Sequence, residues 1–390
     1  MKNTNTVWWS CQKYRSFNGL ISFWSILIII HFTTCNPVGE NLSISSGDTA
    51  RLSYAERFSI VHYDTTAVLT VMDEQRQVVQ QYRTSTYPNS CRGVSACFQI
   101  PVQNTVAMTT PYLAIIDALG EAGAVRAVSS IMSLYNATLT HLNENGKIIT
   151  LGSTKNLDQE QLVALGPDAL FIPYTRTALE LHDKLIELSI PVLSITSHKE
   201  THPLGKAEWL KFFGVLFNRT PEADSIFRGI EDDYLQTKQR YQGQHNKPKV
   251  MAGYARRGSW IAPGGKSYFA RLLEDAGADY VFAENGDSGN ITLSFERAHE
   301  LGQQADYLFF ISMGPVKWEL IRAREPLIND WQSVTQGKVF SNDGSINAQG
   351  GNDYWGKGFL APHVILKDLA MALSPNTIHP DSLVYFRKPI

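Results

Sequence analysis

The chain has little of what marks several classes of protein. Only four cysteines occur among its 390 residues, charged residues make up 18%, and the formal net charge is -2. A nucleic-acid partner would need a concentrated basic face, so none is expected, and no run of like charges suggests a charged tail. The hydrophobic fraction of 43% is that of an ordinary globular protein and supplies enough apolar material for two cores.

Signatures of catalysis and of direct metal binding are also missing. The ten histidines form no tight cluster and no His-rich loop, whereas capture of a free metal ion needs about three or four converging ligands. No Gly-x-Ser-x-Gly elbow occurs, and the glycine pair of 263–266 has the wrong spacing for a phosphate loop. The sequence therefore predicts no catalytic residues, no metal site and no cofactor.

The first residues carry an export signal. Basic residues precede an apolar run at 17–32, a pattern typical of a secretory signal. Cys35 follows closely, where a bacterial lipoprotein carries its lipid. We predict a signal peptide over 1–35 with acylation at Cys35, followed by a linker over 36–52. An uncleaved anchor is the alternative, because the run is nearly long enough to span a bilayer. Both place the remaining chain outside the cytoplasmic membrane, in the periplasm or cell envelope.

Two further cysteines, Cys91 and Cys97, lie close together in a stretch rich in turn-forming residues. In an oxidising compartment a local disulfide is expected. A zinc site would need more ligands nearby than the sequence offers.

The pattern of apolar residues predicts an α/β fold. Strand-like alternation from 53 to 86 predicts an N-terminal hairpin or small sheet. From 102 onward, short apolar runs alternate with helical stretches, which indicates βα units on parallel sheets. The expected strands form a first series (102–109, 125–129, 147–151, 168–173 and 191–196) and a second series (249–255, 279–282, 306–312 and 338–341).

One long helix separates the two series. Thr220 suits the N-cap position and Pro221 the first helical position, and apolar residues then recur at helical spacing. At about 1.5 Å per residue the helix is roughly 33 Å long. We predict a rigid helix over 220–245 that joins an N-terminal lobe, 53–219, to a C-terminal lobe, 246–390, and that permits only a small opening.

The two halves repeat one arrangement. Glu160, in NLDQE, and Glu296, in ITLSFE, each fall in the first turn of an expected helix just before a buried strand. Acidic residues complement the helix dipole there, so this placement alone is explained by helix stability.

Several motifs resemble class III ABC-transporter solute-binding proteins, which carry ferric siderophores, haem and cobalamin. These are NLDQEQLVALGPDALFI, the long helix and LSFE. The segments HPLGKAEWLKFFGVLF, WIAPGGKSYFARLLEDAGADY, GGNDYWGKGFLAPHVILKDL and LVYFRKP resemble the version of this family found in Bacteroidetes. The resemblance covers nearly all of 55–389. It implies two Rossmann-like lobes with central sheets, bridged by one rigid helix, with the ligand in the cleft between them. It also implies that Glu160 and Glu296 dock onto arginines of a permease dimer, which works with its ATPase.

The ligand is expected beyond the carboxyl ends of the strands, where open α/β sheets bind ligands. Aromatic groups there offer flat contact area to a bulky chelate. Two adjacent guanidiniums would suit a ferric siderophore of net negative charge, although a solvated turn explains them equally, and only one is expected to face the cleft. The candidates are Thr109, Thr110, Tyr174 and His198 in the first lobe, and Tyr254, Arg256, Arg257, Trp260, Met313 and Trp355 in the second.

The expected function is therefore capture of a metal chelate by a monomeric, lipid-anchored component of an importer. A ferric siderophore is favoured, with cobalamin or haem as alternatives within the class. An exported interaction protein or enzyme without a transporter is the alternative from another class.

Overall fold

The computed structural model describes residues 47–92, 94, 96–241, 247–374 and 382–389, and the chain from Ser45 onward forms one compact unit. The predicted signal peptide, Cys35 and residues 36–46 of the predicted linker lie outside the described residues, while the rest of that linker contains the first observed strand, at Asp48–Thr49. None of the helices in the described ranges combines the length and apolar character needed to cross a bilayer.

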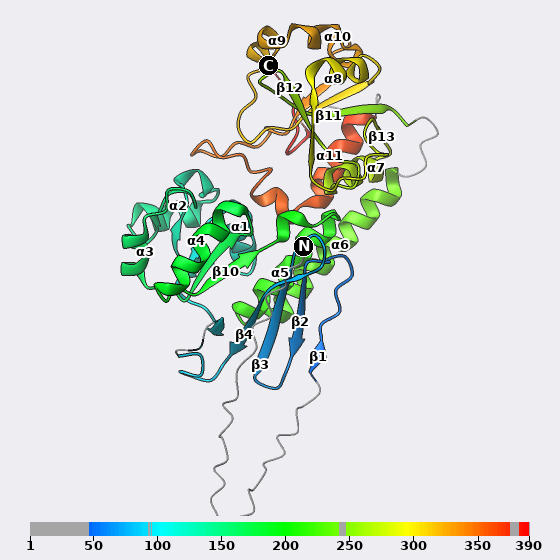
Figure 1. Ribbon diagram of the computed structural model, residues 1–390. Helices are drawn as coiled ribbons and strands as arrows, with labels where there is room; N and C mark the ends of the chain where they lie inside the picture. The colour runs from blue at the N-terminus through cyan, green and yellow to red at the C-terminus, as the bar shows by residue number, and fades with distance from the viewer. Residues whose placement is uncertain (1–46, 93, 95, 242–246, 375–381, 390) are drawn as a thin grey trace, which may run out of the picture. The chain divides into compact units, whose positions relative to one another are not determined.

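The described part of the chain begins with a five-stranded sheet, drawn in blue to cyan in Figure 1. Strands β1 (Asp48–Thr49), β2 (Phe58–His62), β3 (Thr66–Met72) and β4 (Val78–Ser85) are antiparallel neighbours, and β5 (Cys97–Gln99) runs parallel to β4. Of the predicted alternatives, a hairpin or a small sheet, the structure therefore has the sheet.

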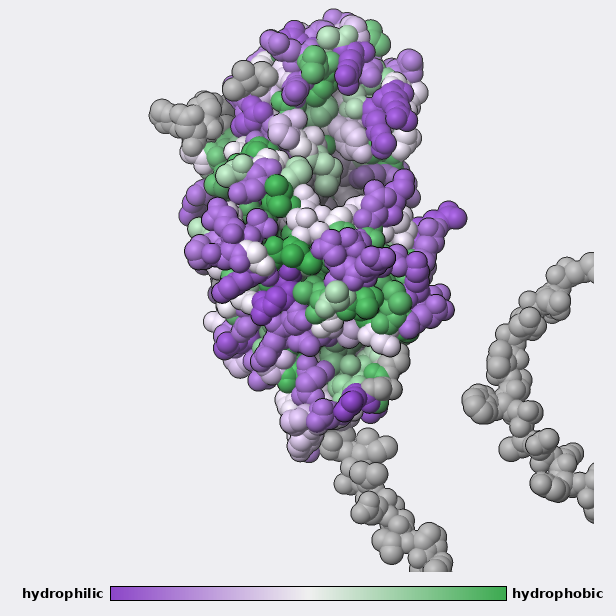
Figure 2. Space-filling view, turned by 90° about the vertical axis from the view of Figure 1, so that its left-hand side faces the viewer, coloured by the Kyte–Doolittle hydropathy of each residue, from purple (hydrophilic) through white to green (hydrophobic). Residues whose placement is uncertain are grey.

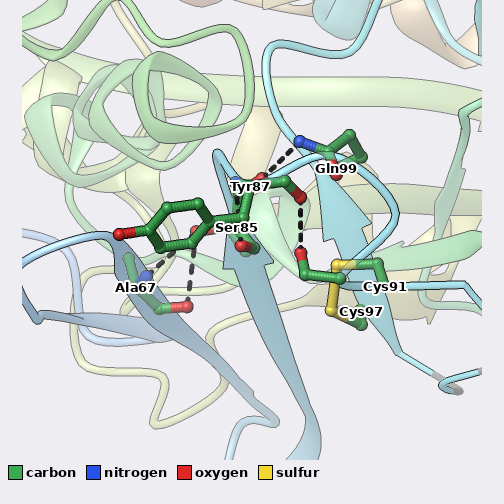
Figure 3. The surroundings of a disulfide bond; sticks show 8 residues. Ala67, Ser85, Tyr87, Cys91, Cys97 and Gln99 are labelled. Carbon is green, nitrogen blue, oxygen red and sulfur yellow. Dashed lines mark hydrogen bonds between the residues drawn. A yellow bond between two sulfur atoms is a disulfide. The ribbon is translucent and has the colours of Figure 1, made fainter.

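A disulfide closes the loop between β4 and β5 (Figure 3). It joins Cys91 to Cys97, as predicted. Beside it, the Ser85 hydroxyl accepts the backbone N–H of Tyr87, and the Gln99 amide donates to the Ser85 carbonyl. The disulfide therefore reinforces a turn that already has its own hydrogen bonds.

The N-terminal lobe is built on a parallel sheet of order β10-β9-β6-β7-β8. Its strands are β6 (Thr105–Ala107), β7 (Val125–Val128), β8 (Ile149–Thr150), β9 (Ala169–Pro173) and β10 (Val192–Ile195). Its helices are α1 (Thr110–Ala118), α2 (Ala137–Glu144), α3 (Gln159–Leu165), α4 (Arg176–Glu187) and α5 (Pro203–Leu216). Each predicted strand of the first series contains an observed one. After β6 the chain adds β7 and β8 on one side and then β9 and β10 on the other, so the strand order reverses between β6 and β9.

The C-terminal lobe repeats this plan and adds a hairpin. Its parallel strands are β13 (Asp279–Tyr280), β11 (Lys249–Arg256), β15 (Tyr307–Phe310) and β16 (Val339–Ser341), in that spatial order. Antiparallel to the end of β11 lies β12 (Ser259–Pro263), followed by β14 (Asn290–Ser294). Its helices are α7 (Tyr268–Asp275), α8 (Phe295–Gly302), α9 (Trp318–Arg324), α10 (Gln332–Thr335) and α11 (Pro362–Leu373).

The sequence did not predict the hairpin of β11 and β12. Its two-residue turn has both central residues in the left-handed region, Arg257 at φ 52° and Gly258 at φ 74°. Two positive φ angles match the right-handed twist of the flanking strands. Arginine is not a usual residue for such a turn, so the sequence signal is weak. The predicted α/β fold is otherwise confirmed.

Helix α6 (Thr220–Tyr241) packs against α5 in the first lobe and α11 in the second (Figure 1). It is also tied to α7, because the Tyr234 hydroxyl donates to Asp275 at 2.7 Å and the Lys238 ammonium lies 2.9 Å from the same carboxylate. The predicted connection to 245 extends into residues outside the described range.

A buried carboxylate fastens the N-terminal sheet to helix α5. Glu208 is 0% exposed, and its side chain accepts the backbone N–H groups of Ser53, Tyr54 and Ala55 at 2.8 to 3.2 Å. The Lys211 ammonium completes the site at 3.0 Å. Because these donors satisfy the charge, a buried glutamate is tolerated here.

Candidate functional site

A cavity of about 670 Å³ lies between the two lobes. It meets each sheet where the strand order reverses. In the first lobe, Thr109 follows β6 and Pro173 ends β9; in the second, Tyr254 lies near the end of β11, and Ser312 and Met313 follow β15. The carboxyl ends of strands beside such a reversal are where α/β sheets bind ligands. Two equivalent crevices therefore face one cavity, whose volume is typical of small-molecule sites.

Aromatic side chains supply much of the wall. They include Tyr254 from β11, Tyr268 from the start of α7, Tyr354 and Trp355 from the loop before the short helix η5 (Lys357–Leu360), and Phe359 within it. The Trp355 indole is held in place because its N–H donates to the Ser312 carbonyl at 2.8 Å. Fixed rings offer a flat, apolar surface at little conformational cost.

Three lysine or arginine side chains line the cavity, and two of them have no carboxylate partner in the part of the chain that the structure describes. Lys199 forms an ion pair with Glu74. Within the described ranges, no carboxylate lies within ion-pair distance of Arg256 or Lys206. Arg256 is exposed, and Lys206 is half-buried with its ammonium 3.5 Å from the ring centroid of Tyr268. The surrounding walls remove water from Lys206 and lower its pKa to about 7.

His198 and Glu200 stand beside these cations. The His198 side chain is exposed to the cavity, yet loss of water lowers its pKa to about 4, with Lys199 and Lys206 adding to the effect. The imidazole is therefore neutral near pH 7. Glu200 is buried, which raises its pKa, and its carboxylate accepts N–H groups from Arg57 and the Trp209 indole among others.

The structure places six of the ten predicted ligand residues on the cavity wall: Thr109, His198, Tyr254, Arg256, Met313 and Trp355. The other four, Thr110, Tyr174, Arg257 and Trp260, are not among its lining residues.

Trp260 was wrongly predicted as a ligand residue, because it belongs to the core. It is 0% exposed, donates from its indole to the Ala252 carbonyl at 3.1 Å, and packs against Trp331. Alternate residues of a strand point to opposite faces. In β12 the cavity-facing residues are Ile261 and Pro263, so the neighbouring tryptophan faces inward.

The other three predicted residues, Arg257, Thr110 and Tyr174, do not line the cavity, for local reasons. Arg257 occupies the hairpin turn, while Arg256 lines the cavity, so one arginine of the pair faces the cleft. Thr110 begins α1, and its hydroxyl lies 3.4 Å from that of Ser133. Tyr174 is half-buried just beyond β9, where the preceding proline reaches the cavity instead.

Four further lining residues were not predicted from the sequence: Lys206, Tyr268, Tyr354 and Phe359. The signal for Lys206 was present: it is a lysine within PLGKAEWLKFFGVL, a helix whose residues are nearly all buried. A charged residue at such a position needs either a partner or a role. The three rings come from segments whose approach to the first lobe depends on tertiary structure.

Glu160 and Glu296 occupy equivalent surface positions on the two lobes. Each is exposed and lies in the first turn of its helix, α3 or α8. These helices are capped by Asp158, which accepts the N–H of Gln161 at 3.0 Å, and by Ser294. The Glu296 backbone N–H and then the Ser294 hydroxyl lower the pKa of the Glu296 carboxyl, so it is ionised near pH 7.

The face shown in Figure 2 is largely polar, with apolar residues in small groups and no single continuous patch. Among the described residues, no group of three or more His, Cys, Asp or Glu side chains could hold a metal ion.

Two α/β lobes joined by a helix, with a cavity between matching sheet ends, define a solute-binding protein. The chain belongs to the periplasmic binding protein family, whose model matches residues 106–344. This confirms the predicted resemblance to class III ABC-transporter solute-binding proteins, a group of binding proteins and not of enzymes. The N-terminal sheet, β1 to β5, precedes the matched region.

Known proteins are similar to this chain in sequence or in fold. An uncharacterized lipoprotein of Methanocaldococcus jannaschii, MJ0878, is 22% identical over 390 residues, covering 92% of this chain and 90% of its own length. A periplasmic heme binding protein from Pseudomonas aeruginosa has a similar fold, with a TM-score of 0.57 and 16% identity over 74% of this chain and 98% of its own. The siderophore binding protein FhuD from Vibrio cholerae, solved with Fe3+-Desferal, has a TM-score of 0.53 and 16% identity over 70% and 99%.

Proposed function

We propose that this protein binds a ferric siderophore in the cavity between its lobes and delivers it to an ABC permease. The observation that carries the proposal is Arg256, an exposed guanidinium without a carboxylate partner among the described residues, on the wall of an aromatic cavity. A guanidinium pairs well with carboxylate and other oxyanions. Rings and a free cation together suit a bulky chelate of net negative charge.

Haem is the second candidate. The neutral imidazole of His198 and the thioether of Met313 both line the cavity, and both groups serve as axial ligands of haem iron. Cobalamin is the remaining alternative within the class, and its binding would require neither Arg256 nor Lys206.

Tryptophan fluorescence tests ligand binding, because five of the eight tryptophans follow the predicted signal peptide. The probes are ferrioxamine B, an iron(III) tris-catecholate, haemin and cyanocobalamin. We expect an iron(III) siderophore complex to quench with a Kd below about 1 µM, which corresponds to roughly -8 kcal/mol. Trp355→Phe removes the indole that lines the cavity and should reduce the quench. Failure of all four probes to bind would refute chelate capture.

Delivery is proposed to use Glu160 and Glu296 as docking contacts for the permease dimer, one per lobe. Charges at the rim of an interface mainly set orientation and association rate. The Glu160→Ala, Glu296→Ala double variant should keep ligand affinity within about twofold but lose uptake. The matched control is Glu180→Ala with Glu300→Ala, which also removes one exposed glutamate per lobe and should keep uptake.

The outcomes separate the alternatives. Lost ligand affinity in the first double variant would show that these glutamates shape the cleft. Retained uptake would remove them as docking residues. Absence of uptake in the unaltered protein together with its own permease would favour an exported interaction protein. The lipid anchor at Cys35 is a separate proposal, supported by relatives named as lipoproteins, and mass spectrometry of the mature N-terminus would test it.

A further inference from the structure

Lys206 is an unusual cation for a binding cavity. It is the fourth residue of α5, and its ammonium lies over two rings, 3.5 Å from the centroid of Tyr268 and 5.4 Å from that of Phe359. Both rings come from the C-terminal lobe, whereas the lysine comes from the N-terminal lobe. The ammonium thus spans the cleft at the point where the lobes meet.

The described charged groups around Lys206 do not neutralise it. No carboxylate lies within ion-pair distance among the described residues. Glu200 raises the pKa of Lys206 but accepts hydrogen bonds from backbone N–H groups and from the Trp209 indole. His198 is neutral near pH 7. The rings of Tyr268 and Phe359 compensate part of the lost hydration by cation–π contact, and that is the support the ammonium has.

For folding alone, a neutral apolar side chain would serve better at this position. Removing water from an ammonium without an opposite charge is unfavourable. A residue that opposes stability at the wall of a binding cavity is typical of a functional site. The missing partner is an anionic group, and the adjoining rings limit its shape to something flat.

We infer that Lys206 selects chelates that present an anionic oxygen on an aromatic ring, such as a catecholate. The ring would stack on Tyr268 or Phe359 while its oxygen accepts hydrogen bonds from the ammonium. Arg256, on the other lobe, would pair with a second anionic group of the same chelate. The inference rests on the proposed function and specifies its ligand class.

Titration of Lys206 gives this proposal a pH signature. The pKa of Lys206 in the free protein is about 7, and a bound anion would raise it. Affinity for an anionic chelate should therefore be level below pH 7 and fall above it, by up to about tenfold per pH unit until the pKa of the bound state is reached. His198 titrates near 4, well below this window.

The test compares an iron(III) tris-catecholate, which is trianionic, with ferrioxamine B, which carries no anionic aryl group. Lys206→Met should weaken binding of the tris-catecholate by roughly ten- to hundredfold, the value of a hydrogen bond to a charged group, and change ferrioxamine binding by less than threefold. The decline above pH 7 should vanish in Lys206→Met. In Lys206→Arg it should be absent up to about pH 10, because arginine does not titrate there.

The control variant is Lys184→Met, which removes the same charge from an exposed position of the same lobe. It should leave both affinities unchanged. Lys206→Met should also melt at the same or a higher temperature, so weak binding would not reflect poor folding.

Two outcomes would overturn the role of Lys206 while leaving chelate binding intact. One is that Lys206→Met loses affinity for both probes equally, and the other is that it binds the tris-catecholate as tightly as Lys184→Met does. A wild-type protein that binds ferrioxamine but no tris-catecholate would also overturn it. Failure of the wild type to bind any chelate would refute the proposed function and this inference together.

Discussion

Replacing Asp275 by alanine would test how firmly the interlobe helix holds the C-terminal lobe. Asp275 lies at the end of α7 and is 1% exposed. It accepts the Tyr234 hydroxyl and the Lys238 ammonium from α6, and Arg271 from its own helix lies 3.3 Å away. The substitution leaves these donors facing a gap at the join between α6 and α7.

The expected loss follows from the burial of each partner. Breaking a buried ion pair by removing one member costs roughly 3–5 kcal/mol. The Lys238 side chain is 20% exposed and the Arg271 side chain is 41% exposed. Both can therefore regain contact with water when the carboxylate is removed. We therefore expect a loss of about 3 kcal/mol of unfolding free energy. At about 2 °C per kcal/mol for a protein of this size, Tm should fall by about 6 °C.

Urea denaturation followed by tryptophan fluorescence would measure this change, with hydrogen exchange of α7 as a local readout. Tyr234→Phe is the matched control, because it removes one hydrogen bond and keeps the ion pair, and it should lose only about 1 kcal/mol. A loss below 1 kcal/mol for Asp275→Ala, or unchanged exchange in α7, would show that apolar packing of α6 on α11 alone fixes the lobe.

Two further contacts allow similar predictions. Glu208→Ala leaves three backbone N–H groups without their acceptor and should lower the unfolding free energy by about 3–5 kcal/mol; urea titration would reveal this, and a loss under 1 kcal/mol would mean that water replaces the carboxylate. Asn347→Ala removes a hydrogen bond of 3.0 Å from the C-terminal lobe to the Met132 carbonyl of the other lobe. It should speed chelate release about two- to tenfold in stopped-flow measurements, and an unchanged rate would show that this contact does not hold the cleft closed.

The parallel strands were predictable because buried strands are apolar almost throughout. Eight of the nine predicted strands contain an observed one, for example β9 within 168–173 and β15 within 306–312, and the ninth, 249–255, covers β11 except for Arg256. The β11–β12 hairpin was not predicted because its turn is formed by Arg257 and Gly258, and a sequence without Asn-Gly or Asp-Gly gives little warning of such a turn.

The same hairpin explains why the candidate site was only partly predicted. In β11 the sequence correctly predicted Tyr254 and Arg256, which share one face of the strand and line the cavity. On β12 the face of each residue depends on register with β11, where Ala255 pairs with Trp260. Without that register, a tryptophan near a strand end is as easily assigned to the ligand as to the core. Tertiary contact, and not local pattern, decided between them.

Two departures from ordinary folding preferences lie on the cavity wall. Lys206 lies in an otherwise buried helix without a carboxylate partner among the described residues, and Met313 is 74% exposed. Elsewhere, buried charges such as Glu208 have full sets of donors. Sequences that fold well are locally consistent, and exceptions mark places where function opposes stability. A cavity that must bind a charged chelate and then release it needs such groups, because a wall already satisfied by its own contacts would have nothing to offer the ligand.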